Sequence, residues 1–196
     1  MRTDTIYINQ KGEQVTTKEK NLSNIITKEI MQIGFYQNEK GEIQVVKMPR
    51  IIEKVPNKLP REITSLQEMF SGTLIFNQDL SQWDTANVTN MQSMFSVAKS
   101  FNGNISSWNT ANVTNMHNMF GIASAFNQDI SQWNTTNVTN MSYMFYEAKS
   151  FNQDISLWNV NQIKEHYDFS VDSGIHNPNK LPKKWVILGT NESKIK

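Results

Sequence analysis

Residues 108–120 read WNTANVTNMHNMF, and almost the same thirteen residues occur at 83–95 (WDTANVTNMQSMF) and at 133–145 (WNTTNVTNMSYMF). The repeat has a constant period, because its tryptophans stand at equal intervals, at Trp83, Trp108, Trp133 and Trp158. A period of this length is typical of repeat proteins, in which each unit buries its apolar side chains only against its neighbours. The sequence therefore predicts a stack of four units.

Within one unit, the apolar residues are spaced as on one face of an α-helix. From Val113 to Phe126 the intervals between them are 3, 3, 1, 3 and 3 residues. Thr110 and Asn112 precede this face, where their side chains would cap the first turn of a helix. After Phe126, Ile130 alternates with polar neighbours, as in a half-buried strand. One unit is therefore predicted to contain a short strand, a turn and a helix.

Strands that follow one another through a helix pair in parallel. We therefore expect an α/β fold, a short right-handed leucine-rich-repeat-like solenoid of 25-residue strand-helix units, preceded by a small N-terminal β-hairpin module. The two hairpins are expected at Gly12 and Gly41, because each glycine lies in an N-x-K-G-E sequence between β-prone segments.

The pattern divides the chain into four parts. They are a β-hairpin module (1–47), a proline-containing connector (48–61), the four-unit repeat solenoid (62–159) and a C-terminal cap (160–196). The segment KKWVIL, from Lys183, is expected to close the cap as a strand.

Composition excludes several classes of function. The net charge is +1, and residues 65–159 hold only two lysines against six acidic residues, so we expect no nucleic-acid binding. Cysteine is absent, which rules out disulfides and thiolate metal sites. No apolar run is long enough for a transmembrane segment, and the N-terminus shows neither a signal peptide nor a lipobox. The three histidines share no spacing typical of a metal or catalytic set, so we expect no enzyme and no cofactor.

Two groups of residues are candidates for an interaction surface. The first is an outward row at equivalent positions of the predicted strands: Asp79, Asn104, Asp129 and Asp154. Stacked carboxylates could gather a cation, but Asn104 interrupts the row and like charges repel. A solvated face that offers hydrogen bonds to a partner is favoured over a metal site.

The second group comes from positions that differ between units. Matched pairs such as Gln92-Ser93, His117-Asn118 and Ser142-Tyr143 vary, as does the pair Tyr146-Glu147, and all are expected on the outer side of the helices. His117, Tyr143 and Tyr146 are therefore candidate interaction residues. The sequence does not choose between this surface and the strand face.

The segment FNQDISQWNTTNVTNMSYMFYEAKSFNQDIS resembles the short repeat found in bacterial surface proteins of the BspA-like leucine-rich repeat group. In mycoplasmas it is also called the PARCEL repeat and is treated as a domain of unknown function. The resemblance covers residues 62–170. It implies a leucine-rich-repeat-like solenoid on secreted proteins or lipoproteins, a role in adhesion or host interaction, and no catalytic residues.

These observations favour a non-enzymatic surface-repeat protein, a monomer that acts as an adhesion-like module for an unknown protein or glycan ligand, for example one presented by a host. The alternative is an intracellular or truncated repeat protein with only a structural role. The resemblance implies a cell-surface or secreted location, whereas the lack of a signal sequence leaves a cytoplasmic location open.

Overall fold

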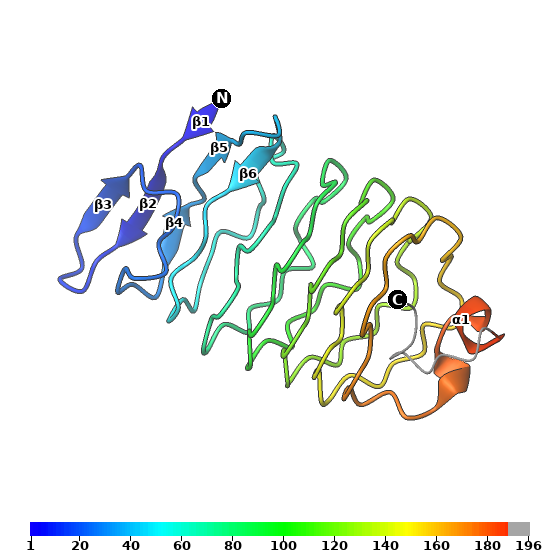
Figure 1. Cartoon of the computed structure of the whole chain (residues 1–196). Helices are drawn as coiled ribbons and strands as arrows, with labels where there is room; N and C mark the ends of the chain where they lie inside the picture. Colours follow the sequence, from blue (N-terminus) through cyan, green and yellow to red (C-terminus); the bar gives the residue numbers. More distant parts are fainter. Residues whose placement is uncertain (188–196) are drawn as a thin grey trace.

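The computed structural model describes residues 1–187. Figure 1 shows an elongated stack of coils, with two small sheets at its N-terminal end and a short helix at the other end. From Ser65 to Glu165 each coil lies between the coils that precede and follow it in sequence.

Within residues 1–187, six short strands form two three-stranded antiparallel sheets, with the orders β1-β5-β6 and β3-β2-β4. Their bounds are β1 Arg2–Thr3, β2 Thr5–Ile8, β3 Gln14–Thr17, β4 Ile30–Gln32, β5 Phe35–Gln37 and β6 Ile43–Val45. The two expected hairpins are present, because β2 pairs with β3 and β5 pairs with β6.

The N-x-K-G-E sequence accounts for both hairpin turns. Gly12 and Gly41 have φ angles of +79° and +82°, in the left-handed region that glycine adopts without a steric cost. The Oδ1 atom of Asn9 accepts the backbone N–H of Glu13 at 3.0 Å, and Asn38 makes the equivalent bond in the second hairpin. The asparagine side chain therefore closes each turn from inside.

From Ser65 onward the chain winds in coils of equal length, one for each sequence repeat. Isolated parallel bridges join equivalent residues of successive coils, namely Ser65, Asn90, Asn115, Asn140 and Glu165. Along each bridged segment, two kinds of backbone hydrogen bond alternate. One residue donates its N–H to a carbonyl of the next coil, and a neighbouring residue donates its N–H to the carbonyl three residues earlier in the same coil. Phe95 N–H, for example, donates to Met119 O at 2.9 Å, and Met94 N–H donates to Met91 O at 3.2 Å.

The predicted α/β solenoid of strand-helix units is therefore wrong, because the segments predicted as helices consist of consecutive turns. The Oδ1 atom of Asn90 takes the N–H of Gln92 at 3.0 Å, which removes a donor that a helix would need. Ser93 and Val97 then adopt φ angles of +53° and +60°, which a right-handed helix does not allow. A chain of i→i+3 turns spaces apolar residues by three, as one helix face does, and this explains the error.

The strands predicted before the tryptophans are also absent. In their place a ladder of asparagine side chains joins the coils. The backbone N–H of Asn102 donates to Oδ1 of Asn77 at 2.7 Å, Asn127 donates to Asn102 at 2.8 Å, and Asn152 donates to Asn127 at 3.0 Å. The side-chain amide thus takes the place of a backbone carbonyl in holding neighbouring coils together.

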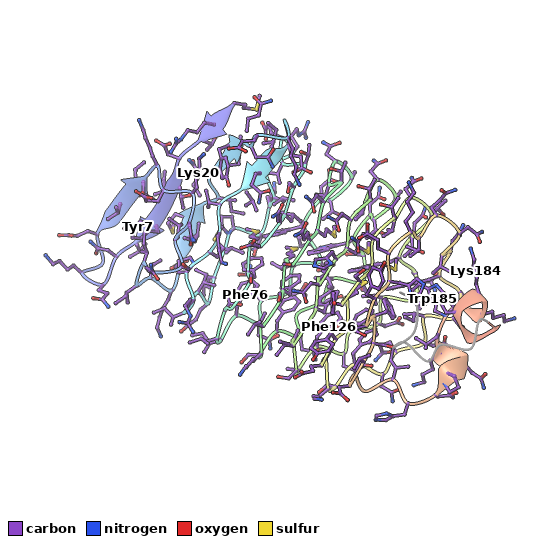
Figure 2. All side chains as sticks on the ribbon, viewed as in Figure 1. Tyr7, Lys20, Phe76, Phe126, Lys184 and Trp185 are labelled. Atoms are coloured by element: carbon purple, nitrogen blue, oxygen red, sulfur yellow. The ribbon has the colours of Figure 1, made fainter. Side chains whose placement is uncertain are left out.

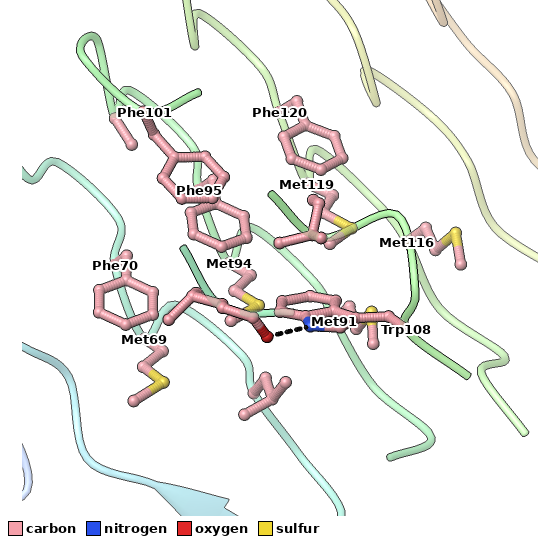
Figure 3. Packing of buried hydrophobic residues seen from close by; sticks show 14 of the residues in the cluster. Met69, Phe70, Met91, Met94, Phe95, Phe101, Trp108, Met116, Met119 and Phe120 are labelled. Atoms are coloured by element: carbon pink, nitrogen blue, oxygen red, sulfur yellow. Dashed lines mark hydrogen bonds between the residues drawn. The ribbon is translucent and has the colours of Figure 1, made fainter. Parts of the chain in front are cut away.

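The interior of the coils is a set of aromatic and methionine columns (Figure 3). Phe95 and Phe120 stack at 5.6 Å with an interplanar angle of 4°, and Trp108 and Trp133 stack at 6.3 Å with an angle of 3°. Each unit was expected to bury its apolar side chains against its neighbours, and Trp83, Trp108 and Trp133 are accordingly each 4% exposed. Each indole N–H also donates to a carbonyl of the preceding coil, for example from Trp108 to Leu80 O at 2.9 Å.

The segment 48–61 contributes to the same interior as the coils. Ile52, Val55 and Leu59 are buried in the common hydrophobic cluster, and the backbone carbonyl of Pro56 accepts the indole N–H of Trp83 at 3.0 Å. Hydrophobic burial is therefore continuous from the two sheets into the coils.

A short helical segment covers the C-terminal end of the stack. It consists of the 3-10 helix η1 Pro178–Lys180 and the α-helix α1 Lys183–Ile187. The ring centroid of Trp185 lies 4.6 Å from that of Phe169, and Figure 2 shows Trp185 beside the last coils. The prediction that KKWVIL forms a strand is wrong for residues 183–187, while its last residue, at position 188, and the remainder of the predicted cap to position 196 lie outside the described residues.

Candidate interaction surface

The first candidate group forms a row of turns, which we call the turn row. In each member, Oδ1 accepts the backbone N–H of the serine two residues later, at 2.8, 3.1, 2.9 and 2.9 Å for Asp79, Asn104, Asp129 and Asp154. These are Asx turns, in which a short polar side chain replaces a backbone acceptor. The role of the turn row in shaping the coil accounts for its residue types.

Electrostatics agree with this local role. Hydrogen bonds from the following serines hold the pKa of each aspartate carboxyl of the turn row below its ordinary value. The backbone N–H is the largest cause for Asp79 and Asp129, and the serine hydroxyl is the largest cause for Asp154. Across residues 1–187, no group of three or more histidine or acidic side chains is arranged to hold a metal ion.

The second candidate group is brought together by the fold, and we call His117, Tyr143 and Tyr146 the tyrosine patch. The rings of His117 and Tyr143 meet edge to face with centroids 5.7 Å apart, and those of Tyr143 and Tyr146 do so at 6.0 Å. All three side chains are at least partly exposed. In the described part of the chain, no hydrogen bond or ring contact joins the patch to the turn row.

Three carboxylates act on Tyr146, the C-terminal member of the tyrosine patch. The pKa of Tyr146 is raised, first by a hydrogen bond to Glu147 and the charge of that residue, and further by the charges of Asp172 and Asp168. We call Glu147, Asp168 and Asp172 the acidic rim. Within residues 1–187, none of the three forms an ion pair.

The backbone explains why these side chains point outward. Tyr143 and Glu147 have φ angles of +59° and +53° and occupy the third position of tight turns. Turns of this kind require a positive φ at that position. Met144 and Phe145, which lie between these two turn positions, are fully buried. Tyr143 is exposed, and Tyr146 and Glu147 are partly exposed.

Two parts of the surface differ from the sequence-based expectation. Ser142 was expected on the outer side of a helix, but it is 2% exposed, and its Oγ accepts the N–H of Tyr167 at 3.2 Å. Asp168 and Asp172 were not identified as candidates, because in the sequence they lie beyond the last clear repeat. They follow Tyr143 and Glu147 by one repeat period, and this spacing is the signal that would have found them.

Among the described residues, no helix has the length and apolar character needed to cross a lipid bilayer. Comparison with curated proteins and with solved structures finds no significant match. A family model described as "Mycoplasma protein of unknown function, DUF285" matches residues 64–185, which include the bridged coils from Ser65 to Glu165. The match agrees with the resemblance to a mycoplasma domain of unknown function and gives no support to the leucine-rich repeat assignment. The chain therefore belongs to the DUF285 family of mycoplasma proteins of unknown function.

Proposed function

We propose that this protein is a non-enzymatic, adhesion-like interaction module that binds a basic segment of a protein ligand through the tyrosine patch and the acidic rim. The observation that carries this proposal is the convergence of three aromatic side chains beside three carboxylates that have no cationic partner within residues 1–187.

Packing does not require the residues of the patch. Gln92 is the equivalent of His117 in the preceding coil, and Asn118 is the equivalent of Tyr143 in the coil before it. Ser96 occupies the position that corresponds to Tyr146, two coils earlier. The coils with and without these side chains bury the same methionine and phenylalanine columns. The aromatic residues are therefore additions to the surface of a repeated core.

The chemistry of the patch suits a cationic side chain. Lysine and arginine are attracted to the faces of tyrosine rings, and a carboxylate beside the ring adds a charge-assisted hydrogen bond. Tyrosine is also enriched in protein interfaces. The same acidic rim repels phosphate groups, which argues against a nucleic-acid partner.

A single patch is small, so we expect one copy to bind weakly. Many copies on one surface would bind tightly, because each later contact forms at a high effective concentration. This expectation agrees with a role at the cell surface. That location is supported by the resemblance of the repeat to bacterial surface proteins, and surface labelling of intact cells tests it directly.

The binding experiment uses variants that copy residues from neighbouring coils. His117→Gln, Tyr143→Asn and Tyr146→Ser remove the patch and install side chains that the same positions already hold elsewhere in the stack. The matched control is Asp129→Asn, which copies Asn104 in the turn row. Each protein is displayed on beads, and retention is measured on host cells and on an immobilised oligolysine peptide.

We expect the unchanged protein and the control to be retained, and the patch variant to lose retention on both surfaces. Equal retention of all three proteins would refute the patch as the binding surface. If displayed protein is retained no better than bare beads, the module has no such ligand, and the purely structural role replaces this proposal.

A further inference from the structure

A groove lies where the N-terminal sheets meet the first coil. Its volume is about 490 Å³, within the range of about 300–1,000 Å³ that is usual for small-molecule sites. Distant segments of the sequence line it, among them Lys20, Tyr36 of β5, Lys40, Lys47 and Glu68 of the first coil. We call it the lysine groove.

The charges in the groove are incompletely paired. Lys47 Nζ lies 3.1 Å from Glu68 Oε2, whereas Lys20 Nζ lies 4.5 Å above the ring of Tyr36 and has no carboxylate partner in the described chain. Lys40 also lacks an ion pair there, as does Glu39. With three lysines against two glutamates, the lining keeps a positive charge that an anionic ligand would neutralise.

The rest of the lining is made of neutral hydrogen-bonding groups. Val45 is aliphatic, and side-chain amides come from Asn21, Gln37, Asn38, Gln44 and Gln67. The amides of Asn38 and Gln44 are already hydrogen-bonded within the protein, whereas the amide nitrogens of Asn21 and Gln67 have no partner in the described chain. Burial, followed by the charge of Glu68, raises the pKa of Tyr36, so its phenol remains a hydrogen-bond donor at neutral pH. A lining of amides, a phenol and ammonium groups matches a ligand with many hydroxyls and one acidic group.

We propose that the lysine groove binds a small polyhydroxylated acid, namely an acidic saccharide. Its carboxylate faces Lys20 and Lys40, and its hydroxyls accept hydrogen bonds from the amide nitrogens of Asn21 and Gln67. A simple inorganic anion would not need the amide nitrogens of Asn21 and Gln67, which have no hydrogen-bond partner in the described chain. This site is separate from the tyrosine patch, because residues between 20 and 68 line the groove whereas the patch begins at His117, two repeat periods after Gln67. The two proposals can therefore fail independently.

The test is a titration of the full-length, ¹⁵N-labelled protein followed by NMR. D-glucuronate, D-glucose and inorganic phosphate are compared at the same ionic strength. We expect glucuronate to cause saturable shifts in residues of the groove and to bind about tenfold more tightly than glucose, because glucose lacks the carboxylate. Phosphate binding as tight as glucuronate binding would overturn the assignment to a saccharide, and the absence of saturable glucuronate binding would overturn the site.

A pair of lysine variants separates a specific site from general charge attraction. Lys40→Gln removes an ammonium group from the groove and leaves the turn intact, because Lys40 contributes only its backbone N–H to the bond with Asn38. Lys58→Gln removes an exposed lysine outside the groove. We expect K40Q to weaken glucuronate binding about tenfold with no change in Tm, and K58Q to bind normally. Equal weakening by both variants would show that net charge alone attracts the ligand.

Discussion

Replacing Phe120 with alanine tests whether the aromatic columns hold the stack together. Phe120 is fully buried and contacts four rings. Their centroids lie at 3.8 Å for Phe126, 5.6 Å for Phe95, 5.7 Å for Phe145 and 6.2 Å for Trp133. One substitution therefore removes contacts within its own coil and with the coil on each side.

The expected cost follows from these contacts. Truncating a buried phenylalanine to alanine costs about 3–5 kcal/mol, and each aromatic pair adds about 0.5–1.5 kcal/mol beyond the area that it buries. With four ring partners, Phe120→Ala belongs at the upper end, so we expect a loss of about 5 kcal/mol in the free energy of unfolding. A domain of this size has about 5–15 kcal/mol in total, so the variant should be close to unfolding.

The measurement is urea unfolding followed by tryptophan fluorescence. Two controls define the result. Phe120→Leu retains most of the buried side chain and should cost about 1.5 kcal/mol. Leu157→Ala removes an apolar side chain that is 82% exposed and should change stability by less than about 0.5 kcal/mol. A cost below about 2 kcal/mol for Phe120→Ala, or an equal cost for Leu157→Ala, would refute the assignment of this column to the core.

Three further predictions concern single features of the structure. Replacing the three aspartates of the turn row with asparagine should leave Tm at pH 7 nearly unchanged, because Asn104 makes the same turn. The folded pKa values of these aspartates are lowered, so their contribution to stability is present above the unfolded pKa of about 3.9 and is lost as pH falls through the folded values. The variant should therefore lose less Tm between pH 5 and pH 3 than the unchanged protein does. An equal loss in the two proteins would contradict the role of the carboxylates. Gly103→Ala should lower stability by about 1–3 kcal/mol in thermal unfolding, because the new Cβ would lie 2.0 Å from the backbone oxygen of Gln78; an unchanged Tm would show that the coils separate easily at this point. Thr5→Val should raise stability by about 1 kcal/mol, because Thr5 Oγ1 is buried without a hydrogen-bond partner among the described residues; a loss of stability in the same assay would mean that the hydroxyl is satisfied.

The sequence alone determined the repeat, its period and most of its interior. The tryptophan, methionine and phenylalanine columns were evident from spacing, because each coil must place the same side chains against its neighbours. The turns at Gly12 and Gly41 were also predictable, since the N-x-K-G-E sequence carries both the glycine and the capping asparagine. His117, Tyr143 and Tyr146 were identified because they differ between coils that are otherwise alike.

Tertiary structure decided the conformation of each coil and the composition of the sites. An apolar residue at every third position satisfies either a helix or a series of tight turns, and the choice depends on hydrogen bonds to the next coil, such as that from Phe95 N–H to Met119 O, which no local pattern reports. The acidic rim and the lysine groove likewise bring together residues from separate segments, as Lys20, Tyr36 and Glu68 show. Local spacing restrains which side chains are buried, whereas contacts across coils determine which backbone geometry buries them and which polar groups meet at the surface.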